Sequence, residues 1–228
     1  MTPTVPAAGS TPAPQPAAPA ARSPSKLGEW LSVRQNQYTA GVGAALVVVL
    51  AVGLVVWGGK RKQQFAMRAL DEARGTAEAG NLPLAASQLQ RVISSYGGTD
   101  AAAEATIALN QVRMINGQSE LAVTGLRDFL KTNPAPKYLS TAQSMLGTAL
   151  ENTGKAADAG AAFLSAAESA ELPFLKAEYL VDAGRAFSNA GKKDDAIKAY
   201  RQVVTDLRDQ PAYTEAMVRL SELTQGKL

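Results

Sequence analysis

The stretch NAGKKDDAIKAYRQVV, residues 189–204, contains the local pattern from which the fold of this chain is predicted. Gly191 is followed by two lysines and two aspartates, and apolar residues then recur at the three- and four-residue spacing of one helix face. Asp194 and Asp195 lie where carboxylates favour the start of a helix. The stretch therefore predicts a turn followed by an amphipathic helix.

The same pattern occurs three more times upstream, at a constant spacing of 37 residues. Each unit has a glycine, an alanine five residues later, and a large apolar residue four residues after the alanine. The three sets are Gly80, Gly117, Gly154 and Gly191; Ala85, Ala122, Ala159 and Ala196; and Leu89, Leu126, Phe163 and Tyr200. A fixed period of this size indicates stacked helical hairpins.

Each position of the pattern has a physical role in such a hairpin. Glycine adopts the positive φ that ends many helices, at no steric cost. Alanine lets the second helix cross the first closely, and the large apolar residue lies one turn further along the same face, where it fills the space between the helices. The first helix of each later unit is predicted from the apolar residues before its glycine, such as Leu109, Leu146 and Leu180.

These residues resemble the tetratricopeptide repeat (TPR), whose first helix carries an apolar residue, then Leu-Gly, as in Leu146 and Gly147, and then an aromatic residue, as in Phe187. The second helix carries the alanine and the aromatic residue, and Pro134 lies where the family has a late proline. The usual period is about 34 residues, so the extra residues are predicted to lie in the connections between repeats. The resemblance implies an all-α, right-handed TPR-like α-solenoid of about four helical hairpins, with a capping helix over 212–224.

The chain before the repeats is predicted to form three segments. Residues 1–26 are rich in proline and alanine and lack apolar periodicity, so we expect a disordered tail. Residues 27–38 form a short apolar cluster that suits a membrane interface. Residues 39–59 predict one transmembrane helix, because no charged side chain occurs between Arg34 and Lys60 and about 20 helical residues cross a bilayer core. The TPR-like domain is predicted over 60–228.

Two alternatives for the apolar run fit less well. A cleavable signal peptide would have a shorter run, nearer to Met1 and followed by a small-residue cleavage site. A buried helix of a soluble protein seldom runs this long without a polar side chain. Tyr38 and Trp57 bracket the run as interfacial aromatic residues do.

Composition excludes several kinds of site. The chain of 228 residues contains no cysteine and no histidine, which excludes thiol nucleophiles, disulfides, zinc sites built on these residues and imidazole catalysis. Residues 60–228 hold 20 of the 23 basic and 19 of the 20 acidic side chains, so no nucleic-acid surface is predicted. No phosphate-binding glycine loop occurs. We expect no cofactor, no metal, no small-molecule substrate and no enzymatic activity.

The resemblance implies a concave surface, lined by the first helices of the repeats, that binds proteins or peptides. The family's ligand-contacting positions map onto Glu104, Ile107, Gln111, Met114, Thr141, Ser144, Thr148, Asn152, Arg185 and Asn189. The alternative for each of these residues is an ordinary solvated helix face. Membrane lipid, contacted by the single transmembrane helix, is the second expected partner.

The whole layout of tail, membrane helix and TPR-like domain resembles the bacterial ancillary subunit of the Sec translocon. This resemblance implies a membrane-anchored scaffold for protein–protein interactions in the cell envelope, beside periplasmic chaperones. A scaffold that coordinates cell-envelope assembly or division is the alternative. The resemblance implies an inner-membrane protein with a periplasmic domain, whereas the basic residues after the apolar run, Lys60, Arg61 and Lys62 among them, favour a cytoplasmic domain.

Overall fold

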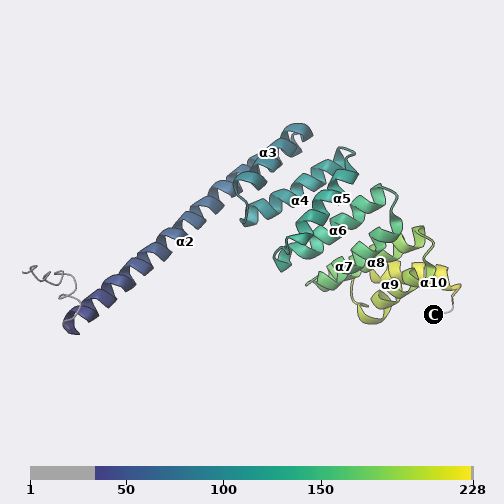
Figure 1. Ribbon diagram of the computed structural model, residues 1–228. Coiled ribbons are helices and arrows are strands. Elements are labelled where there is room, and N and C mark those ends of the chain that lie inside the picture. The colour runs from purple at the N-terminus through teal and green to yellow at the C-terminus, as the bar shows by residue number, and fades with distance from the viewer. Residues whose placement is uncertain (1–33, 227–228) are drawn as a thin grey trace, which may run out of the picture. The chain divides into compact units, whose positions relative to one another are not determined.

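The computed structural model describes residues 34–226, and this range is helical apart from turns and short connections. Within it nine helices follow one another (Figure 1). They are α2 (Arg34–Glu78), α3 (Leu82–Ser95), α4 (Asp100–Ile115), α5 (Ser119–Lys131), α6 (Pro136–Asn152), α7 (Ala156–Ser169), α8 (Pro173–Asn189), α9 (Lys193–Asp206) and α10 (Tyr213–Thr224). The all-α prediction is confirmed for these residues. The predicted tail, 1–26, and residues 27–33 of the predicted interfacial segment lie outside the described residues.

The chain divides into two compact units, and the boundary lies between Val55 and Val56. In the first unit, α2 carries the apolar run that the sequence predicts to span a membrane. The large apolar side chains described between Val42 and Leu54 are all at least 57% exposed. Its most apolar window has a mean hydropathy of 2.4 and is not buried within the protein. By length and composition α2 is therefore a candidate membrane span.

The second unit is a stack of helices in which each helix packs against its neighbours in the chain (Figure 1). The end of α2 and α3 form the first hairpin, α4 and α5 the second, α6 and α7 the third, and α8 and α9 the fourth. Helix α10 follows as a single helix, and its Ala216 and Leu220 are buried against the stack. Arg219 of this helix is half-exposed and is paired with Glu215 and Glu222.

The three repeated positions of the sequence pattern have the same environment in every hairpin. The four alanines are fully buried, and the four large apolar residues are at most 1% exposed. The four glycines have φ between 72° and 83° and follow the first helix of each pair. In the second repeat, the amide of Gly117 donates to the carbonyl of Met114, and the amide of Gln118 donates to the carbonyl of Arg113 at 2.7 Å. These bonds satisfy the last carbonyls of α4 in the manner of a Schellman turn.

Replacing Gly117 with alanine is expected to lower the free energy of unfolding by about 1–2 kcal/mol, the cost of placing a Cβ at a left-handed φ. Asparagine, which tolerates this conformation better, is expected to cost less at the same position. Urea denaturation of the two purified variants measures the difference. Equal losses would mean that the left-handed conformation does not limit stability at this turn.

The buried apolar residues form two clusters that meet inside the second repeat. One contains residues between Ala66 and Val112, and the other contains residues between Ala122 and Leu220. Between them lies Asn110, only 1% exposed, whose amide donates to the carbonyl of Thr106 at 2.8 Å. A Cβ on Gly125 of α5 would lie 2.4 Å from the Asn110 side chain, so the glycine makes room for this buried polar group.

The predicted location of the extra residues in each repeat is wrong. The connections 132–135 and 170–172 are short, whereas α6 and α8 are each 17 residues long. The longer period is therefore accommodated in the helices, because added turns on neighbouring helices can pack on one another. The right-handed sense of the stack stays a prediction.

Candidate functional site

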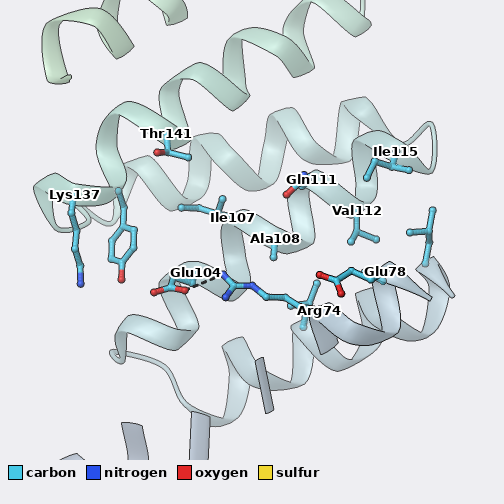
Figure 2. Close-up of a pocket in the computed structure, with 14 residues that line it drawn as sticks. Arg74, Glu78, Glu104, Ile107, Ala108, Gln111, Val112, Ile115, Lys137 and Thr141 are labelled. Carbon is cyan, nitrogen blue, oxygen red and sulfur yellow. Dashed lines mark hydrogen bonds and ion pairs between the residues drawn. The ribbon is translucent and has the colours of Figure 1, made fainter. Parts of the chain in front are cut away.

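A groove with a volume of about 610 Å³ is lined by the first helices of the first three repeats and by α3 (Figure 2). The side chains that line it come from α2 (Arg74, Ala77 and Glu78), α3 (Leu82 and Leu89), α4 (Glu104, Ile107, Ala108, Gln111, Val112 and Ile115) and α6 (Lys137, Tyr138 and Thr141). The six α4 residues recur at three- and four-residue spacing, so one face of α4 forms the largest part of the wall.

The wall contributed by α4 is mainly apolar. Val112 is 5% exposed and belongs to the core, whereas Ile107 is half-buried. Ile115, at the end of the helix, is 64% exposed, and Figure 2 shows it at one end of the groove. When a partner covers an isoleucine that is exposed to water, the free energy falls. Ile115 therefore favours the binding of a partner.

An ion pair connects the walls of the groove. Arg74 Nη2 lies 3.0 Å from Glu104 Oε2, which joins α2 to α4, and Figure 2 shows the two side chains pointing toward each other. Their side chains are 43% and 30% exposed, and partly exposed pairs of this kind contribute only about 0–1 kcal/mol to stability. The pair therefore adds polar specificity beside the apolar residues of α4.

A second cation is held at the start of α6. Lys137 Nζ lies 3.0 Å from Asp100 Oδ2 and 4.8 Å from the centroid of the Tyr138 ring. The hydrogen bond from Lys137 lowers the pKa of Asp100, and the same bond raises the pKa of Lys137. Burial raises the pKa of Tyr138, whose hydroxyl donates to the carbonyl of Asp100 at 3.4 Å. At neutral pH the groove is thus bordered by an ammonium group and a neutral phenol.

The structure brings together four of the ten residues predicted to contact a partner, namely Glu104, Ile107, Gln111 and Thr141, which all line the groove. Met114 is partly buried against the core of the later repeats. Ser144, Thr148 and Asn152 lie further along α6 and are not among the groove-lining residues.

The last two predicted residues, Arg185 and Asn189, line a smaller pocket of about 300 Å³ beside α10. Arg185 bridges two carboxylates, with 2.8 Å to Glu151 Oε1 and 2.8 Å to Asp182 Oδ1. These bonds, chiefly the one to Asp182, raise the pKa of Arg185. The guanidinium therefore links α6 to α8 through these ion pairs.

The contribution of the first repeat to the groove was not predicted from the sequence. Arg74 and Glu78 occupy the positions of Gln111 and Ile115 one period earlier, and both line the groove. The 37-residue period could have identified both residues. The first helix of this repeat, however, matches the family pattern poorly. Leu82, Lys137 and Tyr138 had no comparable signal, because their place in the groove depends on how helices from different repeats pack.

The arrangement suits recognition rather than chemistry. Asp71 and Glu72 are exposed neighbours on α2, and Asp194 and Asp195 lie in the first turn of α9. Adjacent helical residues point in different directions, so neither pair converges on one point. The absence of enzymatic activity stays a prediction.

Comparisons with known proteins agree with the repeat architecture. A sequence profile of the tetratricopeptide repeat matches residues 178–206, which span most of α8 and all of α9. The crystal structure of MamA protein aligns with a TM-score of 0.56 at 18% identity, covering 71% of this chain and 82% of MamA. The structure of a Podosopora anserina protein assigned as a kinesin light chain, with nearly identical TPR-like repeats, aligns with a TM-score of 0.55 at 17% identity, covering 70% of this chain and 85% of that one.

No curated protein sequence matches the chain. At such low identities the structural similarities show the fold alone. The chain thus has a TPR-like fold, and residues 178–206 are recognisable as a TPR from their sequence.

Proposed function

We propose that this protein is a membrane-anchored scaffold that binds a protein partner through the groove of its first three repeats. The observation that carries the proposal is the apolar face of α4, where Ile107 and the exposed Ile115 lie within a groove of about 610 Å³. The flanking Arg74–Glu104 pair and Lys137 supply polar contacts around it. Such a surface fits an extended or helical segment with apolar side chains and a polar margin.

Replacing Ile115 with aspartate is expected to reduce partner recovery about tenfold or more, because losing a buried apolar anchor at an interface costs about 2 kcal/mol. Affinity purification of the full chain from detergent-solubilised membranes, quantified by mass spectrometry, measures the change. Leu121→Asp is the matched control, since Leu121 is 53% exposed, lies outside the groove and is close in sequence. Equal losses in both variants would contradict groove binding, as would undiminished recovery with Ile115→Asp.

The membrane anchor in this proposal is the apolar part of α2. Support comes from its length, its mean hydropathy of 2.4 and the exposure of its large apolar side chains. The basic residues Lys60, Arg61 and Lys62 follow directly, and the Arg61 guanidinium lies 3.9 Å from the centroid of the Trp57 ring. An aromatic ring and a basic cluster at the end of an apolar helix are typical of the head-group region.

We place the protein in the bacterial inner membrane with its TPR-like domain in the periplasm, ancillary to the Sec translocon and its chaperones. The layout of the chain supports this placement, and the count of basic residues opposes it. A fusion of alkaline phosphatase to the C-terminus tests it, because that enzyme is active only outside the cytoplasm. An inactive fusion would place the domain in the cytoplasm and exclude periplasmic partners.

The alternative is a scaffold for cell-envelope assembly or division. Co-purification of translocon or chaperone subunits favours the first function, and their complete absence rules it out. A fluorescent fusion that concentrates in a band at the septum favours the alternative, whereas a uniform membrane signal contradicts it.

A further inference from the structure

The connections between repeats lie along one edge of the stack. Because neighbouring helices are antiparallel, the chain returns to this edge at 96–99, 132–135 and 170–172 before each new first helix (Figure 1). We call this side the inter-repeat edge. The opposite edge carries the turns at Gly80, Gly117, Gly154 and Gly191.

The basic residues near the start of the second unit lie at the inter-repeat edge. One period before Asp100, the first residue of α4, is Gln63. Its neighbour Lys62 donates a hydrogen bond from Nζ to the carbonyl of Gly97, at 3.0 Å, in the first of the connections. The repeats therefore begin with no spacer between Trp57 and the edge. If Trp57 and these basic residues contact lipid head groups, as proposed above, this edge starts at the level of the head groups.

The third connection exposes apolar side chains at this edge. Leu172 is 50% exposed and Phe174 is 43% exposed. One and two periods before Phe174 are Lys137 and Asp100, which form an ion pair with each other at 3.0 Å. The same position is thus charged and solvated in the second and third repeats and aromatic in the fourth, so the repeat architecture does not itself require an apolar residue there.

We propose that the inter-repeat edge rests on the bilayer surface, with Leu172 and Phe174 inserted among the lipid head groups. Lys62 contacts the first connection of this edge, and with its neighbours Lys60 and Arg61 it matches the anionic head groups of a bacterial membrane. Apolar side chains beside basic residues are the combination by which proteins bind at a membrane interface. With this contact, the first helices of the repeats stand up from the membrane and the glycine turns face away from it.

The test uses the full chain in vesicles of phosphatidylethanolamine and phosphatidylglycerol. Since the chain has no cysteine, single cysteines can carry an environment-sensitive fluorophore, at Glu171→Cys on the inter-repeat edge and at Gln118→Cys on the opposite edge. Lipids with a nitroxide on the head group are expected to quench the label at position 171 and to spare the label at 118. In the Leu172→Ser, Phe174→Ser double variant the quenching at position 171 is expected to be lost.

Three controls make each outcome decisive. Leu84→Ser with Leu121→Ser, which also removes two exposed leucines, is expected to retain the quenching at position 171. Phe174→Trp, a substitution that keeps an interfacial aromatic ring, is expected to retain it as well. Circular dichroism melting identifies any variant that unfolds. Quenching at position 171 that is no greater than at 118, or that survives in the double serine variant, overturns the proposal.

A label at Ala45→Cys, read with a nitroxide on the acyl chain, reports the membrane anchor separately. Quenching at position 45 without quenching at 171 refutes the edge contact and leaves the anchor intact. The absence of quenching at position 45 refutes the anchor, and the label at position 171 then shows whether the edge binds the bilayer without it.

Discussion

Replacing Gly184 with valine is expected to lower the free energy of unfolding by about 1–3 kcal/mol, the usual cost of overpacking a core. A Cβ at this position would lie 2.6 Å from Cζ of the Tyr200 ring. Tyr200 is 1% exposed and belongs to the main core cluster, so the ring has little room to move. Urea denaturation of the purified protein in mild detergent measures the loss.

Gly75 provides the control for this clash. It lies in α2, and a Cβ added to it would have no heavy atom of a neighbouring side chain within 4 Å. Gly75→Val is expected to change stability by less than about 0.5 kcal/mol, because valine and glycine differ little as helix formers. The valine at position 184 should also cost less beside Tyr200→Leu, where leucine replaces the ring as in the first two repeats. A loss at position 184 that equals the loss at 75 would refute the contact.

Replacing Phe163 with alanine is expected to cost about 3–5 kcal/mol, the range measured for removing a buried phenylalanine from a core. Phe163 is 1% exposed and covers Gly147, where an added Cβ would lie 2.8 Å from the ring. Glycine cannot fill the cavity that alanine leaves, because it has no side chain. Thermal unfolding and urea denaturation of the variant measure the effect.

Leucine at position 163 tests the reason for this loss. Leu89 and Leu126 occupy the same position in the first and second repeats and are at most 1% exposed there. Phe163→Leu is therefore expected to cost less than about 1.5 kcal/mol. If leucine costs as much as alanine, the position requires an aromatic ring and is not simply a space to be filled.

The hairpins could be predicted well from the sequence because the relevant information is local. A glycine at positive φ ends a helix through bonds to carbonyls three to five residues earlier, and an apolar stripe is defined by neighbours three and four positions apart. Both signals are contained within one repeat, so Gly117 and Ala122 could be interpreted without knowing how repeats stack. The same signals recur in four units, which makes a chance pattern improbable.

The candidate site was predicted only in part, because a groove is formed by side chains from several helices. Glu104, Ile107, Gln111 and Thr141 were identified by their helix positions, and the structure places all four in the groove. Asn110 fits the helix pattern of its repeat, yet it is buried beside Gly125 at the boundary between two core clusters. The pairing of a polar residue with a glycine on another helix produces no periodic pattern in the sequence.

The all-α class, the 37-residue period, the glycine turns and the apolar run before the repeats could all be predicted from the sequence alone. Three features became visible only in the packed helices: Arg74 and Lys137 border one groove, Arg185 joins two helices, and Lys62 contacts the first connection. The physical reason is the range of the interactions. Helix formation and capping depend on residues a few positions apart, whereas grooves, bridges and edges depend on the angle and distance at which separate helices pack.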